Sequence, residues 1–578
     1  MVLRRAWPAV GLAALLTIAP GHAASRGGPS SFDVRDLREW LTYIASDDLQ
    51  GRATFSAGLG LAASYIESHL RDWGVKPGGD NGSYLQTVRV TGVKSTSHST
   101  VIVEIGGERR TFAEDAIRFP RNAGANQRIT IDRVEFAGYG LDAPQANHQD
   151  YRRLDVKGAA VVWLGSAGPA GIDQSLTRLL NGRNRYATDE LLAAAVIGAG
   201  PVRRGGRGRE AGASAQTTPA PAGAGGRGAI PAADFTTTER LDHVLPPSAT
   251  GSDAFFEFLF SRAPVKYAEL KRKADAREPL PAFRLDGVTL TFDINTDYQV
   301  VRTRLTQNVV AIVEGTDSQL KQTYVAFGAH YDHVGYAEGE VVNESTGVRR
   351  TGAPGVVTPG AENDRIWNGA DDDGSGTVTM MALARAYALG PRPKRSLLFV
   401  WHAGEENGRW GSLYFVDHPT VALDRIVAQL NMDMIGRNRD DKASEGNTVY
   451  LVGSDRISTE LDTVAQAANQ SLSKPLRIDY EYNDPFEPEQ VYIRSDHYSY
   501  ASRGIPVAFF HNALHPDYHA NTDEVSKIQF DKMSRIAELV YATGVRLGNL
   551  DHAPVRDRKG ARAGAPGMSG QAPAALSR

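Results

Sequence analysis

The feature that most constrains the fold is a series of short, uninterrupted apolar segments in the second half of the chain. They alternate with segments of helical periodicity near 377–389 and 459–472, and they read "NVVAIVEG", "TYVAFGAH", "SLLFVWHAG", "IVAQLNMDMIG", "TVYLVGS" and "GIPVAFFH". Strands that are apolar on both sides are typical of a largely parallel sheet covered by helices on both faces. We therefore expect an α/β fold with a mostly parallel central sheet sandwiched by helices.

The first half of the chain predicts that this domain is discontinuous. Residues 30–92 begin with two amphipathic helices, whose apolar stripes include Leu37 in the first and Ile66 in the second. We expect them to join residues 300–550 in one domain. Residues 93–299 are rich in short β-like runs, which predicts a separate, inserted β-rich domain.

Two segments predict little or no ordered structure. Residues near 198–233 contain almost no large apolar side chain and are rich in Gly, Ala, Pro and Arg, and residues 551–578 have a similar composition. Such segments cannot bury enough apolar surface to offset the entropy of ordering them. We therefore expect a disordered loop and a disordered tail. Before the loop, we expect a helix between residues 179 and 196.

The N-terminus predicts export. Arg4 and Arg5 precede an apolar stretch from Ala9 to Pro20, and small residues follow up to Ala23. This is the pattern of a cleavable signal peptide over residues 1–23. Because the apolar stretch is shorter than the roughly 20 residues that span a bilayer, we expect no stable membrane anchor, and a periplasmic or secreted protein.

Composition narrows the chemistry. The net charge of −3 does not indicate a nucleic-acid partner or an anionic membrane surface. The chain has no cysteine, which excludes disulfides, a cysteine nucleophile and thiolate metal sites. Any metal must therefore be held by His, Asp or Glu.

Such side chains follow the apolar segments at the points where the predicted strands end. They are, in chain order, His330, Asp332, Glu405, Glu406, Asp433, His511, His515 and His519. Each of these residues alone could be a hydrogen-bonded core residue or part of a solvated turn. Parallel sheets, however, bind ligands at the carboxyl ends of their strands. Because such side chains follow four of the predicted strands, we favour a binding site. Histidine and carboxylate suit zinc or a similar ion, and the set is large enough for two ions that share a carboxylate.

The stretch "GADDDGSG" offers a shared carboxylate but does not say which one. Asp371, Asp372 and Asp373 stand side by side before a predicted helix, among glycines that permit a tight turn. A solvated acidic turn and a calcium loop are the alternatives, but the spacing and terminal Glu of an EF-hand are absent. The residues themselves leave the choice among the three acids open.

With these motifs the sequence resembles the co-catalytic dizinc exopeptidases, which include secreted bacterial leucyl aminopeptidases and plasma glutamate carboxypeptidases. The resemblance runs from "LQGRATFSAGLGLAASYIESHLRDWGVKPGGDNGSYLQT" to "HPDYHANTDEVSKI", with "GAHYDH", "NGADDDGSG", "GEENG", "NMDMIG" and "DYHANTDE" in order between or within them. It implies the zinc exopeptidase fold and two Zn²⁺ per chain.

The resemblance also implies a role for each matching residue. It assigns His330 and Asp433 to one zinc, Glu406 and His519 to the other, Asp372 to both as the bridge, Glu405 as general base, Asp332 as the group that orients the His330 ring, and Asp496 and Tyr498 to the substrate pocket.

The insertion is similar to the protease-associated domain, most clearly at "GYGLDAPQANHQDYRRLDVKGAAVVWLG". Two features depart from the family pattern: the long connection from Asp332 to Asn368, and the Arg/Gly/Pro-rich loop inside the insertion. Both affect the expected shape of the substrate entrance.

We expect an exported zinc aminopeptidase that hydrolyses N-terminal residues from peptides, because Glu405 could hold a substrate ammonium group. A carboxypeptidase or dipeptidase of the same fold is the alternative, with Arg494 or Arg409 holding a substrate carboxylate. A receptor-like binding protein and a glutaminyl cyclase fit less well, since the full ligand set and the paired "GEE" are present. The G-x-S-x-G and H-E-x-x-H motifs of other hydrolases are absent.

Overall fold

The computed structural model of the protein describes residues 32–200, 233–337 and 353–557. The predicted signal peptide at 1–23, most of the predicted loop near 198–233 and most of the predicted tail at 551–578 lie outside the described residues. Within the described ranges, no helix combines the length and apolar character needed to cross a membrane.

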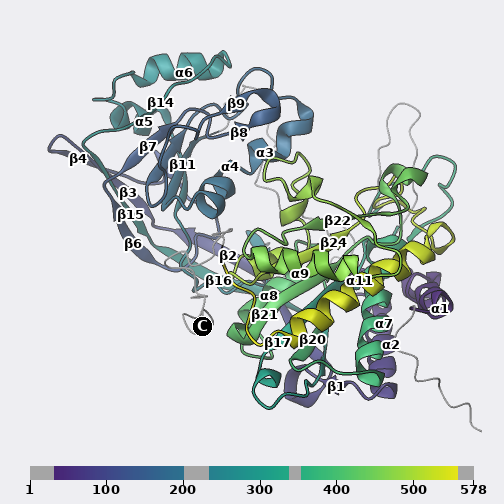
Figure 1. Cartoon of the computed structure of the whole chain (residues 1–578). Helices are drawn as coiled ribbons and strands as arrows, with labels where there is room; N and C mark the ends of the chain where they lie inside the picture. The colour runs from purple at the N-terminus through teal and green to yellow at the C-terminus, as the bar shows by residue number, and fades with distance from the viewer. Residues whose placement is uncertain (1–31, 201–232, 338–352, 558–578) are drawn as a thin grey trace, which may run out of the picture. The chain divides into compact units, whose positions relative to one another are not determined.

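A ten-stranded mixed sheet forms the framework (Figure 1). Its centre consists of four parallel strands in the order β20, β17, β21, β24. Their bounds are Tyr324–His330 for β17, Ser396–His402 for β20, Ile426–Met432 for β21 and Val507–His511 for β24. Each strand comes from one of the apolar segments, so the α/β prediction is confirmed, and the parallel pairing holds for the centre of the sheet.

The flanks of this sheet are largely antiparallel. On one side, β16 pairs with β20, β2 with β16, and β12 with β2; on the other, β22 pairs with β24. The short strand β1 pairs with β16, and β23 lies parallel to β22. The bounds are Lys76–Pro77 (β1), Leu85–Ser97 (β2), Phe235–Thr237 (β12), Thr296–Val313 (β16), Thr448–Val452 (β22) and Arg477–Asp479 (β23).

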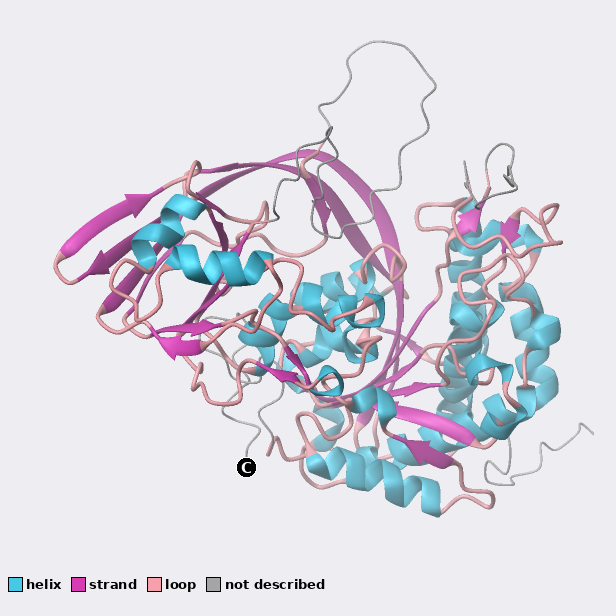
Figure 2. Cartoon of the chain, turned by 90° about the horizontal axis from the view of Figure 1, so that it is seen from above, coloured by secondary structure: helices cyan, strands magenta, loops and turns pink. Residues whose placement is uncertain are grey.

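Helices cover both faces of the main sheet (Figure 2). Side chains alternate between the faces, so that Phe327 joins the core on one face and its neighbour Ala326 the core on the other. The first core also contains residues of α1 (Val34–Ile44), α2 (Ala57–Asp72), α7 (Gly376–Leu389), α9 (Thr459–Gln470) and α11 (Phe530–Asn549). The second contains residues of α8 (Trp410–Asp417) and α10 (His497–Ala501).

Two smaller sheets occupy most of the segment predicted as an insertion. A four-stranded sheet has the order β4-β3-β15-β6, and a six-stranded sheet has the order β14-β7-β10-β11-β13-β5. With α5 (Asp253–Leu259) and α6 (Tyr267–Asp275) they enclose a core of their own. The strands are Thr100–Ile105 (β3), Glu108–Phe112 (β4), Ile117–Arg118 (β5), Gln127–Ile131 (β6), Val134–Ala137 (β7), Ala160–Trp163 (β10), Ala195–Ala199 (β11), Ser248–Gly251 (β13), Ala282–Arg284 (β14) and Val288–Ile294 (β15).

The predicted limits of the insertion, residues 93 and 299, fall inside the paired strands β2 and β16. The short strand β12 comes from the predicted insertion but pairs with β2 in the main sheet. The domain limits therefore stay a prediction.

The helix expected over 179–196 is shorter than predicted. Helical segments α3 (Thr177–Asn181) and α4 (Arg183–Arg185) lead into a wider turn at Tyr186–Glu190, and residues from Ala195 onward form β11. Leu192 has a positive φ of 59°, which ends the helical path. Parallel pairing of β11 with β10 and β13 then takes the apolar residues into a sheet.

Candidate metal centre

The predicted site residues meet at the carboxyl ends of the central parallel strands. His330 is the last residue of β17, and Asp433 directly follows β21. Glu405 and Glu406 lie in the turn after β20, and His519 lies in the segment after β24. Since these strands run parallel and side by side, their ends bring residues nearly 200 positions apart to one edge.

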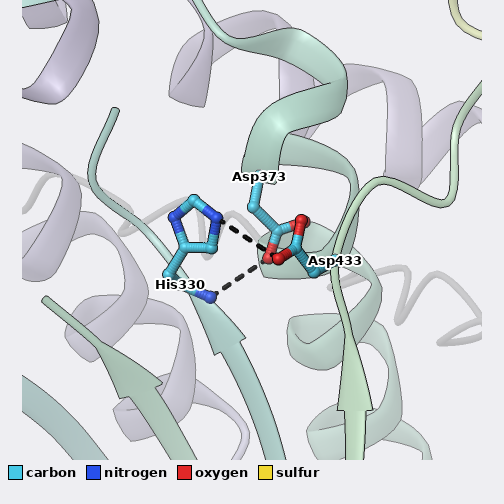
Figure 3. Close-up of side chains that lie close together, drawn as sticks. All are labelled: His330, Asp373 and Asp433. Carbon is cyan, nitrogen blue, oxygen red and sulfur yellow. Dashed lines mark hydrogen bonds and ion pairs between the residues drawn. The ribbon is translucent and has the colours of Figure 1, made fainter. Parts of the chain in front are cut away.

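The first cluster is built on β17 and β21. Nε2 of His330 lies 3.7 Å from Oδ2 of Asp433 and 3.2 Å from Oδ1 of Asp372. Both strand-end residues are buried, with 1% of His330 and 8% of Asp433 exposed. Figure 3 shows the His330 ring and the carboxylates of Asp433 and Asp373 directed toward one another.

The second cluster lies on the other side of Asp372. Nε2 of His519 is 3.0 Å from Oδ2 of Asp372 and 3.0 Å from Oε2 of Glu406. The two oxygens of Asp372 therefore face two different histidines, His330 and His519. Burial opposes ionisation of Asp372, but the close contacts with His330 and His519 outweigh it and hold its pKa well below the usual range.

The three adjacent acids have three different environments. Asp373 also lies close enough to His330 and Asp433 to hold a metal. Its carboxylate, however, accepts backbone N–H groups from His330 at 3.1 Å, Gly376 at 3.0 Å and Met434 at 3.2 Å. Three such bonds hold the helix start and two strand ends together, so backbone donors already occupy the Asp373 carboxylate.

Asp371 is directed to the other side of the turn. It accepts the N–H of Gly436 at 2.6 Å, and its second oxygen lies 3.2 Å from Nε2 of His515. The carboxylate of Asp523 in turn accepts the N–H groups of Asp371 at 2.9 Å and Asp372 at 3.1 Å. Backbone donors therefore fix the turn that presents Asp372.

Asp332 connects the first cluster to the predicted base. Its Oδ1 accepts the N–H of Glu405 at 3.2 Å, and its Oδ2 accepts the Thr54 hydroxyl at 3.1 Å. Nδ1 of His330 donates to the backbone carbonyl of Asp332 at 3.1 Å, while the carboxylate Oδ1 is 3.7 Å away. The main chain of this residue thus fixes the ring tautomer and leaves Nε2 of His330 free for a metal.

Glu405 lines the same pocket as Asp372, Asp433 and His519. Removal from water raises the pKa of Glu405 well above its usual range, and the negative charges of Asp496 and Asp433 act in the same direction. A carboxylate with a raised pKa beside a reacting group has the property that a general base needs.

The donor set fits a pair of divalent cations. Nε2 of His330, Oδ2 of Asp372 and Oε1 of Glu406 are buried, and each makes an ion-pair contact of 2.7–3.2 Å but no well-directed hydrogen bond among the described residues. Buried polar atoms without such bonds are costly unless another ligand satisfies them. Nitrogen and carboxylate oxygen are also ligands that zinc accepts.

His333 is a site residue that the sequence analysis missed. Its Nδ1 lies 2.7 Å from Oε1 of Glu406, and together with Asp372 and Glu406 it forms a second group able to hold a metal. It is completely enclosed, and its ring packs edge-on against His519 with centroids 5.8 Å apart. The feature of the sequence that could have pointed to His333 is its place as the second histidine of "GAHYDH".

Asp496 and Tyr498 lie close to the site but are not among the residues that line the pocket. Asp496 is fully buried, and its Oδ2 lies 3.3 Å from Nδ1 of His402. The Tyr498 hydroxyl donates to Asp189 at 2.6 Å. A role in substrate binding for these two residues stays a prediction.

A small pocket opens beside both clusters. Its polar lining combines Asp372, Glu405, Asp433 and His519 with Arg494, Ser495, His511 and Tyr518, and its apolar lining is Met434, Val491, Phe509 and Leu514. Such a mixture of a few polar groups in an apolar wall is typical of small-ligand sites.

Known proteins that are similar to this chain include aminopeptidases. Residues 308–544 match the model of Peptidase family M28. A probable leucine aminopeptidase of Arthroderma otae is 29% identical over 214 residues, which are 34% of this chain and 55% of that protein. A second one, from Arthroderma benhamiae, is 30% identical over 209 residues, or 33% and 54% of the two chains. The chain thus spans about half the length of these curated relatives.

Two solved aminopeptidase structures are similar to this chain at low sequence identity. An aminopeptidase from Aneurinibacillus sp. strain AM-1 shares 18% identity over 91% of this chain and 96% of its own, with a TM-score of 0.41. A zinc aminopeptidase from Bacillus subtilis shares 16% identity over 89% and 94%, with a TM-score of 0.40. Because this stretch matches the family model, the region from residue 308 to residue 544 belongs to peptidase family M28.

Proposed function

We propose that the protein is an exported dizinc aminopeptidase, which removes N-terminal residues from peptides. The observation that carries the proposal is the position of Asp372, with one carboxylate oxygen 3.2 Å from His330 and the other 3.0 Å from His519. A carboxylate between two histidines is the arrangement expected of a bridging ligand for two metals.

His330 and Asp433 would hold one zinc, Glu406 and His519 the other, and Asp372 both. When bound, zinc supplies a Lewis acid that makes water a competent nucleophile near neutral pH. The protein itself supplies the fixed ligand geometry. Its contributions include the bond from Nδ1 of His330 to the Asp332 carbonyl, which sets the ring orientation.

Glu405 acts as the general base and acid. Its carboxylate takes a proton from the attacking water and returns it to the departing amine. The bond from its N–H to Asp332 ties the base to the same segment that orients His330. One short segment, from His330 to Asp332, therefore positions both a ligand and the base.

Preference for a free amino terminus rests on two points. The relatives that match this region carry the name leucine aminopeptidase. The carboxyl group of Glu405 in the pocket can also accept hydrogen bonds from a substrate ammonium group. The presence of Arg494 in the same pocket favours a second candidate, a dipeptidase or carboxypeptidase.

The test combines metal analysis with substrate choice. We expect purified protein to contain about two zinc ions per chain, as a two-metal hydrolase requires. Aminoacyl anilides should be cleaved and N-acyl dipeptides should not. If only the acylated dipeptides are cleaved, the protein is a carboxypeptidase and not an aminopeptidase. If the protein neither retains zinc nor cleaves either substrate, it is a binding protein.

Glu405→Gln separates proton transfer from metal binding. We expect kcat to fall by about 10²–10⁴-fold, the usual contribution of general acid–base catalysis, while zinc content stays unchanged. Glu257→Gln, at an exposed position on α5, is the matched control. A Glu405→Gln variant with near-normal kcat would show that another group moves the proton.

Export and the insertion are further parts of the proposal. Signal-peptide cleavage predicts that mature protein begins after Ala23, which N-terminal sequencing of protein from the periplasm or medium can check. We also propose that residues 93–299 are a protease-associated domain. An unprocessed N-terminus on protein retained in the cytoplasm would contradict the export proposal.

A further inference from the structure

The segment Gly51–Thr54, which lies between α1 and α2, reaches the candidate metal centre from the N-terminal part of the chain. The carbonyl oxygen of Arg52 accepts the N–H of His333 at 3.2 Å. The Thr54 hydroxyl donates to Oδ2 of Asp332 at 3.1 Å. The segment therefore contacts the residues that directly follow β17.

The side chain of Arg52 binds two parts of the centre at once. Nε donates to the carbonyl oxygen of Tyr331 at 3.0 Å, Nη1 to that of Asn368 at 2.6 Å, and Nη2 to that of Gly369 at 2.9 Å. Nη1 also donates to the carbonyl oxygen of Ile44 at 2.6 Å. One guanidinium group thus joins the end of β17 to the turn that contains the three adjacent aspartates.

Arg52 is a buried cation without a direct counter-ion. Its side chain is completely buried, and among the described residues no carboxylate oxygen lies within 4.0 Å of its nitrogens. Removal from water lowers the pKa of Arg52 to about 10, although the charges of Asp332 and Asp523 oppose this shift, so the group is cationic at neutral pH. A buried charge is costly unless hydrogen bonds satisfy it, and here backbone carbonyls do so. These bonds fix the guanidinium group in one place.

The backbone of the segment is held in an uncommon conformation. Gln50, Gly51 and Arg52 have positive φ values of 49°, 65° and 49° in succession. A β-carbon on Gly51 would lie 2.3 Å from the carbonyl oxygen of Gly335 and 2.5 Å from that of Trp367. Such a conformation persists only where the surrounding structure imposes it. The close packing against these two carbonyls therefore fixes the turn from which the Arg52 side chain enters the interior.

We propose that Arg52, supported by Thr54, is a positioning residue of the metal centre, which sets the spacing between His330 at the end of β17 and the turn that carries Asp372. The inference rests on the proposed dizinc function. Arg52 lies outside residues 308–544, the region that matches the family model, and it does not line the pocket. Its effect should therefore fall on metal binding and kcat, and not on KM.

Arg52→Lys tests this role. Lysine keeps the positive charge, but its ammonium group lacks the planar fork that reaches several carbonyls in fixed directions. We expect zinc affinity to fall by about 10–100-fold, the usual effect of losing a partner that orients metal ligands. We also expect kcat to fall while KM changes little. The visible absorption of the Co²⁺-loaded protein, which reports the geometry of the ligands, should change as well.

Arg395→Lys is the matched control. Arg395 is also buried, with 2% exposed, and donates to the carbonyl oxygen of His552 at 2.9 Å. It directly precedes β20, at the opposite end of this strand from the site. This variant should lower Tm but keep the zinc affinity, kcat and Co²⁺ absorption of the wild type. An equal loss of zinc affinity in the two variants, or unchanged zinc affinity and Co²⁺ absorption in Arg52→Lys, would overturn the inference.

Thr54→Val provides the test if Arg52→Lys does not fold. It removes the hydrogen bond to Asp332 and keeps the shape of the side chain. We expect zinc affinity to fall by about 3–10-fold, the value of one hydrogen bond. Unchanged affinity in this variant would also overturn the inference. Wild-type protein that binds no zinc would instead overturn the proposed function.

Discussion

The two halves of the candidate metal centre are built in different ways. His330 and Asp433 lie at the ends of adjacent strands of the central sheet and are almost completely buried. Glu406 and His519 come from the connections after β20 and β24, and 30% of the His519 side chain is exposed. His519 also has a positive φ of 54°, which a β-carbon disfavours.

This difference indicates that the first half is positioned by the sheet and the second by local turns. Ligands on strands are held by packing and ladder hydrogen bonds, whereas ligands on connections depend on fewer contacts. We therefore expect the His330 side to bind zinc more tightly than the His519 side. The following predictions test that order, from the largest expected effect to the smallest.

Asp372→Ala should abolish zinc binding in both halves of the centre. Because Asp372 faces both histidines, its loss should release both zinc ions, and kcat should fall on the order of 10³-fold or more as several kcal/mol of transition-state stabilisation disappear. Zinc analysis and kcat are the measurements. Asp424→Ala, at an exposed position, is the control, and a variant that keeps both ions would refute the bridging role.

His519→Ala should separate the two halves. We expect this variant to lose one zinc per chain and to keep the other, since His330, Asp433 and Asp372 are untouched. His330→Ala is the partner variant and should lose the more tightly held ion. Competition with a chelator measures both affinities. If the ions that remain in the two variants have equal affinities, the sheet gives no advantage to the first half.

His333→Ala should have a smaller effect, confined to the second half. Its Nδ1 lies 2.7 Å from Glu406, so it orients this ligand or adds to it. Removal of such a partner usually weakens metal binding by about 10–100-fold. Zinc titration should show that the more weakly bound ion alone is affected. If both ions weaken equally, His333 supports the fold of the site and not one cluster.

Glu524→Gln should give the smallest effect and a dependence on pH. Removal from water, with Asp364 and Asp47 nearby, raises the pKa of Glu524 from its usual 4.5 to about 7. A raised pKa means that the stability gained from the bound proton is lost as pH rises from about 4.5 to about 7.

The glutamine variant carries no such charge. Its Tm should exceed that of the wild type by about 1–2 °C at pH 8, and the difference should disappear at pH 5. Glu257→Gln, on the exposed face of α5, should show no such trend. An equal Tm difference at both pH values would show that the effect of Glu524→Gln is not electrostatic.

Some errors of the sequence analysis have a common origin in long-range contacts. The stretch 179–196 has helical periodicity, but pairing of β11 with β10 and β13 converts its end into a strand. His333 belongs to the motif "GAHYDH", but the motif by itself does not show that its partner is Glu406, which is 73 positions away. Neither contact can be inferred from neighbouring residues.

The sequence by itself determined the α/β architecture and the edge at which the site forms. Continuous apolar segments can be satisfied only when both faces of a sheet are covered, and polar residues placed after them must gather at the strand ends. The environment of each of the three adjacent aspartates was decided by tertiary structure. Backbone N–H groups from His330, Gly376 and Met434 occupy Asp373, and Gly436 and His515 occupy Asp371. Asp372 is left to face both histidines, because hydrogen bonding between distant segments depends on how the chain is folded and not on local sequence.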